Sequence, residues 1–117
     1  YLVSLLDMAH RLLAGAGISE TDAPEILTPL IEGTLANVSR LGPPRALTGP
    51  VARGDRQTVS RHLGEIQRFE PALAALYAAL GRHTVAVARR GGHLTPEGAA
   101  FLRLFDGLDG GPSKDPE

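Results

Sequence analysis

The stretch ALTGPVARGDRQTVSRHL, residues 46–63, joins a constrained loop to the start of an amphipathic helix. Its first ten residues include two glycines and a proline, which favour a turn over regular structure. Asp55 then stands where a helix N-cap is expected. Because apolar residues follow with the spacing of one helical face, the pattern predicts a loop over residues 41–54 and a helix after Asp55. The inward side chains of this helix are expected to be Val59, Leu63 and Ile66.

Several features of the loop suit an anionic ligand. The N-terminus of a helix carries unpaired amides and a partial positive charge. Glycines let the backbone approach a ligand closely, and an arginine can bind a carboxylate or phosphate with two hydrogen bonds. On the helix that follows, residues three and four positions apart share a face. The candidate residues of an anion site are therefore Thr48, Gly49, Arg53, Gly54, Asp55, Thr58 and His62.

A structural interpretation of the same loop stays open. Loops with glycine, proline and a capping aspartate connect many helices, and Arg53 can pair with Asp55 instead of a ligand. No candidate for a catalytic acid or base stands out, apart from His62 by its place on the helix face. The four histidines show no metal-ligand spacing, so no metal site is expected.

Outward from this stretch, the periodicity predicts an all-α domain of about five helices. The first begins at Leu2 and ends at the glycines of residues 15–17, and the second runs to about Arg40 with a kink or restart at Pro29. After the helix that Asp55 caps, another covers residues 71–90, and a short last helix follows the signature Thr95-Pro96-Glu97. The expected buried stripe of the long helix is Leu73, Leu76, Tyr77, Leu80, Thr84 and Val87.

Composition narrows the classes of function. The chain has 117 residues, a net charge of −1 and no cysteine. This charge gives no global attraction to nucleic acid or to an anionic membrane, and no apolar run is long enough for a membrane span. We expect no nucleic-acid or membrane partner and a cytoplasmic location.

The two ends predict how the chain is organised. It opens directly in helical periodicity with no capping residue, which suggests a fragment of a longer polypeptide. We expect one helical domain over residues 1–108, and a disordered tail over residues 109–117 because that segment is rich in glycine, proline and charge.

The same stretch, residues 46–63, resembles the signature of the C-terminal domain of the Rossmann-like and DUF2520 proteins. Tyr1-Leu2-Val3, Pro29-Leu30 and the run LYAALGRHTVAVA at residues 76–88 add to the likeness. Such proteins are similar to pyrroline-5-carboxylate reductases and to other members of the 6-phosphogluconate dehydrogenase-like superfamily. Their C-terminal domain is helical, dimerises and completes the substrate cleft. The serine- and glycine-rich motif of the reductases is not reproduced here, so their substrate is not carried over.

The resemblance implies that the chain is the dimerisation and substrate-cleft half of an NAD(P)-dependent oxidoreductase that acts on a small anionic substrate. The segment alone would bind no cofactor and would not be catalytic. A nucleotide-binding domain of the same protein would position the nicotinamide, while this domain orients the substrate. The alternative is a purely structural helical dimerisation module, for which Gly33, Gly64, Gly81 and Gly98 would allow backbones to approach closely.

Overall fold

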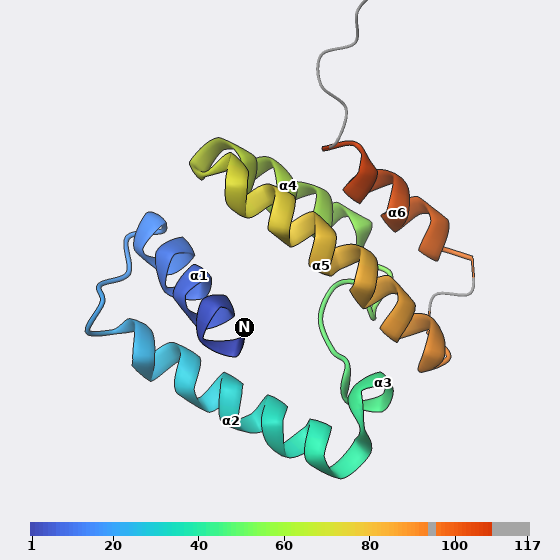
Figure 1. Cartoon of the computed structure of the whole chain (residues 1–117), viewed down its shortest axis with the longest axis horizontal. Helices are drawn as coiled ribbons and strands as arrows, with labels where there is room; N and C mark the ends of the chain where they lie inside the picture. The colour runs from blue at the N-terminus through green and yellow to red at the C-terminus, as the bar shows by residue number, and fades with distance from the viewer. Residues whose placement is uncertain (94–95, 109–117) are drawn as a thin grey trace, which may run out of the picture. The chain divides into compact units, whose positions relative to one another are not determined.

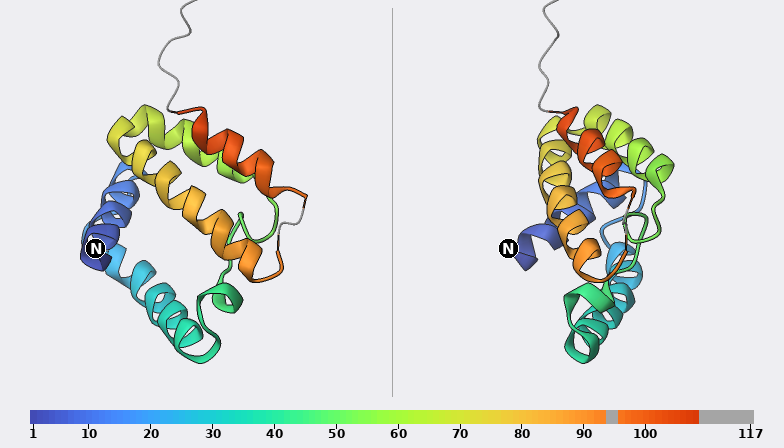
Figure 2. Two further views of the ribbon diagram at one scale, coloured as in Figure 1. Left: turned by 45° about the vertical axis from the view of Figure 1, so that its right-hand side comes forward. Right: turned by 90° about the vertical axis from the view of Figure 1, so that its right-hand side faces the viewer.

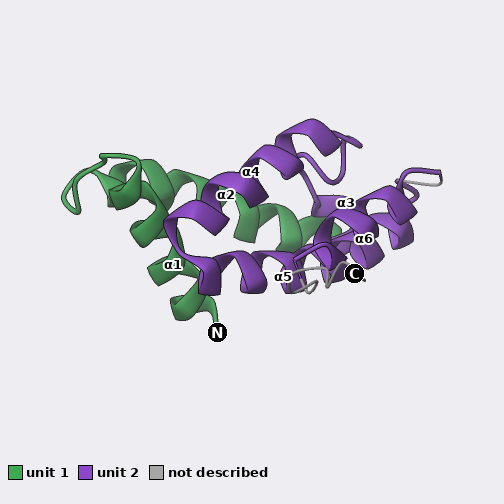
Figure 3. Cartoon of the chain, turned by 90° about the horizontal axis from the view of Figure 1, so that it is seen from above, with its two compact units in different colours: residues 1–42 green, residues 43–117 purple. Residues whose placement is uncertain are grey.

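The computed structural model describes residues 1–93 and 96–108, and this part of the chain is entirely helical apart from turns and loops (Figure 1). The all-α prediction is confirmed. Thr95 of the expected capping signature and the predicted tail lie outside the described residues. The chain divides into two compact units, Tyr1–Gly42 and Pro43–Glu117 (Figure 3).

The first unit contains α1 (Leu2–Gly15) and α2 (Ala23–Leu41). Pro29 lies inside α2, and the helix continues through it without interruption. Of the two predicted alternatives, the restart at Pro29 is therefore wrong, because a proline removes one amide donor without forcing the chain to leave the helix, and the kink stays a prediction. Before α2, the Ser19 hydroxyl accepts a hydrogen bond from the Asp22 amide at 3.1 Å, so Ser19 closes the turn that leads into the helix.

In the described part of the second unit lie four helices: α3 (Pro43–Ala46), α4 (Arg56–Phe69), α5 (Pro71–Arg90) and α6 (Gly98–Asp106). The short α3 interrupts a segment that the sequence predicts to be all loop. α5 contacts α3, α4 and α6, and the two views of Figure 2 show it antiparallel to both α4 and α6. A single extended residue, Glu70, reverses the chain between α4 and α5, since the residue before a proline avoids the helical conformation.

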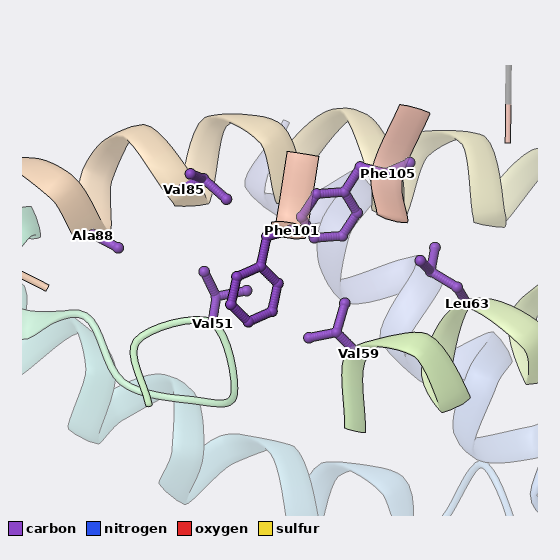
Figure 4. Packing of buried hydrophobic residues seen from close by; sticks show 8 residues of the cluster. Val51, Val59, Leu63, Val85, Ala88, Phe101 and Phe105 are labelled. Carbon is purple, nitrogen blue, oxygen red and sulfur yellow. The ribbon is translucent and has the colours of Figure 1, made fainter. Parts of the chain in front are cut away.

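The core of the second unit lies where α4, α5, α6 and the loop before α4 meet (Figure 4). Phe101 and Phe105 of α6 are completely buried, and their rings are stacked with centroids 6.4 Å apart. The three predicted inward residues of α4, Val59, Leu63 and Ile66, are all buried.

The predicted stripe of α5 is confirmed only in part: Leu73 is buried and Tyr77, Thr84 and Val87 are half-buried, but most of the buried positions lie on a neighbouring face of the helix. Leu76 and Leu80 are exposed, whereas the buried positions carry mostly small side chains: Leu73, Ala74, Ala78, Gly81, Val85 and Ala88. The aromatic rings of α6 need space above α5, and small residues provide it. The packing of Phe105 over Gly81 therefore decides which face of α5 is inside.

Candidate functional site

Asp55 caps α4 as the sequence predicts. Its Oδ1 accepts a hydrogen bond from the Thr58 amide at 3.0 Å, and its Oδ2 accepts one from the Thr58 hydroxyl at 2.8 Å. The pKa of the Asp55 carboxyl is lowered from its usual 3.8, mainly by the hydrogen bond from the Thr58 amide, then by that from the Thr58 hydroxyl. Asp55 therefore stays ionised at neutral pH and satisfies the first turn of α4.

The loop before α4 uses several of its own amides. The amides of Arg53, Gly54 and Asp55 donate to the carbonyls of Gly49, Val51 and Pro50, respectively. Gly49 and Gly54 have φ angles of 93° and 75°, which explains the need for glycine at both positions. These internal bonds make the loop rigid and leave the amides of residues 53–55 occupied.

Val51 anchors the same loop to the core. Its side chain is buried within the cluster formed by α4, α5 and α6 (Figure 4). The loop conformation therefore has a structural cause that does not depend on any ligand, namely the burial of Val51 and the internal hydrogen bonds around it.

The side chains of Thr48 and Arg53 are exposed. Nη2 of Arg53 lies 3.9 Å from Oδ2 of Asp55, and its side chain is 64% exposed, so the pair is a weak surface contact. The Thr48 hydroxyl has no hydrogen-bond partner among the described residues. Both groups are thus available to an external ligand.

His62 is held in a different contact from the other candidate residues. Its Nδ1 lies 3.0 Å from the hydroxyl of Tyr77 on α5, and the two rings meet edge to face. The sequence predicts Tyr77 to be a core residue and does not reveal this pair. Burial raises the pKa of the Tyr77 phenol above its usual 10.0, so the hydroxyl remains protonated at physiological pH.

The structure therefore brings together Arg53, Asp55 and Thr58, while His62 joins Tyr77. Among the residues that the structure describes, no group of three or more histidine, aspartate or glutamate side chains is arranged to hold a metal ion. In the same part of the chain, no helix has the length and apolar character that crossing a membrane requires.

A second feature lies on the other flank of α4. A surface hollow of about 470 Å³ separates the start of α4 from α6, and Arg56 and Arg103 are its two charged lining residues. Its other lining residues are Gln57, Ser60, Ala100 and Leu104. No motif in the sequence reveals this site, because two helices that are far apart along the chain form it.

Comparison with known families links the chain to one of them. The family model described as "Domain of unknown function (DUF2520)" matches residues 1–84, which is more than two thirds of the chain. No curated protein and no solved structure matches this chain. Since the match spans α1, α2, α3, α4 and most of α5, the chain belongs to the DUF2520 family.

Proposed function

We propose that this chain is the dimerisation and substrate-cleft part of an NAD(P)-dependent oxidoreductase, and that its first unit forms the contact with a second copy. The proposal of a dimer rests on the exposure of apolar side chains on α1 and α2. Large apolar side chains are exposed at seven positions of these helices: Leu2, Val3, Leu5, Ile26, Leu30, Leu35 and Val38.

The first unit buries little of its own apolar surface. None of the residues of α1 is buried, and α2 buries only Ala23 and Leu27. A helix with one apolar face is stable when that face packs against another element. Since extended apolar patches on soluble proteins mark interaction sites, a second copy of the same unit is the partner that we propose.

The proposed substrate role belongs to the side chains of the loop before α4. Arg53 and Thr48 are exposed and can reach an external carboxylate or phosphate. The amides of residues 53–55 donate within the loop, so they are not part of the proposed contact. The nicotinamide would come from a nucleotide-binding domain of the same protein, and this domain would orient the anionic substrate toward it.

A purely structural dimerisation module is the alternative function. The burial of Val51 favours it, because this anchor explains the rigid loop without a substrate. The two proposals share the dimer and differ in whether Arg53 contacts a ligand.

The dimer is tested by sedimentation at micromolar concentrations. The substitutions Leu30→Glu and Leu35→Glu each place a charge on the exposed apolar surface of α2. We expect each of them to raise the dissociation constant of the dimer by about tenfold or more. Ala36→Glu is the matched control, because Ala36 is exposed and helical spacing turns it away from both leucines. A monomer at high micromolar concentration, or equal effects of all three variants, would contradict the proposed interface.

The substrate role is tested on the intact protein with a thermal-shift screen against NADPH, NADH and small carboxylic acids. For an acid that the protein turns over, Arg53→Ala should raise KM by about tenfold or more, since a charge-assisted hydrogen bond is lost. Arg61→Ala, another exposed arginine near the start of α4, is the control. Unchanged kinetics in the Arg53 variant would leave only the structural module.

A further inference from the structure

The hollow between α4 and α6 has the character of a binding site for a small anion. α4 and α6 contact each other and lie side by side (Figure 2). The hollow has a volume of about 470 Å³, which falls in the range of about 300–1,000 Å³ for small-molecule sites. Arg56 contributes to its wall from the first turn of α4, and Arg103 contributes from α6.

Neither arginine is neutralised within the described part of the chain. The carboxylates of Asp55, Glu65 and Asp106 are paired elsewhere: Asp55 with Thr58 and Arg53, Glu65 with Arg68, and Asp106 with Arg82. The two guanidinium groups line one hollow and have no carboxylate partner among the described residues. They produce a local positive potential, which a bound anion would neutralise.

The remaining lining residues define what kind of anion fits. The Gln57 amide and the Ser60 hydroxyl lie about one turn or less from Arg56 and add hydrogen-bonding groups. Ala100 and Leu104 are half-buried on α6 and give the hollow an apolar side. Arginine binds phosphate with two parallel hydrogen bonds, so this set suits a phosphate group attached to an apolar moiety.

We propose that the hollow lined by Arg56 and Arg103 binds a small organic phosphate monoester. This site is separate from the proposed substrate residues, because helical spacing places Asp55, Thr58 and His62 on a different flank of α4 from Arg56 and Ser60. The core residues Val59 and Leu63 lie between the two flanks. The proposal therefore goes beyond the function proposed above and does not depend on it.

The test uses calorimetric titration of the protein with phenyl phosphate and, separately, with inorganic phosphate. We expect saturable binding of phenyl phosphate that Arg56→Gln and Arg103→Gln each weaken by about tenfold. Arg61→Gln removes the same charge from an exposed position of α4 that does not line the hollow, so it should change the affinity less than about twofold. Amide chemical shifts should change at residues of α4 and α6 that line the hollow.

Three results would overturn the proposal. The first is no saturable binding of phenyl phosphate at millimolar concentration. The second is equal weakening by all three arginine variants, which would indicate unspecific attraction by charge. The third is equal affinity for phenyl phosphate and inorganic phosphate, which would remove the apolar part of the assignment. Because all three arginines are exposed, the variants are expected to keep the melting temperature of the parent protein.

Discussion

At Gly81, the absence of a side chain is what allows α6 to pack on α5. A Cβ at this position would overlap the ring of Phe105, which is fully buried. We expect Gly81→Ala to destabilise the protein by about 1–3 kcal/mol despite the better helix propensity of alanine. Chemical denaturation monitored by circular dichroism measures this free energy of unfolding.

Gly64 is the matched control for that substitution. It lies inside α4, is exposed, and has open space within 4 Å of the point that a Cβ would occupy. Gly64→Ala should therefore stabilise the protein by about 0.5–1 kcal/mol, since only the conformational freedom of the unfolded chain changes. Stabilisation by both substitutions would contradict the packing of Phe105 over Gly81.

The titration of the Tyr77 phenol makes the stability of the second unit depend on pH. Burial raises its pKa above 10.0, so the neutral form stabilises the folded state, and this contribution is lost as pH rises above 10.0. In a Tyr1→Phe variant, Tyr77 is the remaining tyrosine of the chain. Its absorbance titration should have a midpoint above 10.0 in the folded protein, and stability should fall over the same alkaline range. A midpoint at or below that value would contradict the burial of the hydroxyl.

At the scale of helices, α5 shows why periodicity alone places only part of a buried stripe correctly. Both the leucine face and the alanine-glycine face of α5 have helical spacing, and leucine is normally the better predictor of burial. Here α6 supplies two phenylalanine rings, and small residues on α5 accommodate them. Arg82 also depends on the packing of α6, because it donates to the Phe105 carbonyl at 3.2 Å and pairs with Asp106 at 3.3 Å.

A second prediction for a single helix concerns Pro29 and the stability of α2. Pro29 is exposed and lacks the amide that would continue the helical hydrogen bonds, so it weakens a helix that nevertheless forms. We expect Pro29→Ala to increase stability by about 1–3 kcal/mol. Thermal unfolding followed by far-ultraviolet circular dichroism measures the change, and Ala36→Pro in the same helix should have the opposite sign. A lower stability of the Pro29 variant would mean that the proline ring contributes packing that its exposure does not indicate.

At the scale of the whole molecule, the two units differ in how much core they contain. The second unit buries a cluster that includes Val59, Val85, Phe101 and Phe105, whereas the first buries Ala23 and Leu27. In hydrogen exchange at low protein concentration, we expect amides of α5 to be protected much longer than those of α1. If the first unit forms the dimer contact, protection of α1 rises with protein concentration. Equal protection of α1 and α5 in the monomer would contradict this difference.

Much of this organisation follows from local sequence. The helical class, the start of α5 at Pro71 and the cap at Asp55 depend on residues a few positions apart, and the structure confirms them. The inward face of α4 is equally clear, since Val59, Leu63 and Ile66 are each flanked by polar residues or glycine. Whether Thr48, Arg53 and the other candidate residues bind a substrate stays a prediction.

The sequence by itself determined the helical class, the cap of α4 at Asp55 and the membership of the DUF2520 family. Only the tertiary structure decided which face of α5 is buried, that His62 meets Tyr77, and that Arg56 and Arg103 share one hollow. The physical reason is range: hydrogen bonds within a helix and its caps join residues a few positions apart, whereas these contacts depend on how separate helices fill space against one another.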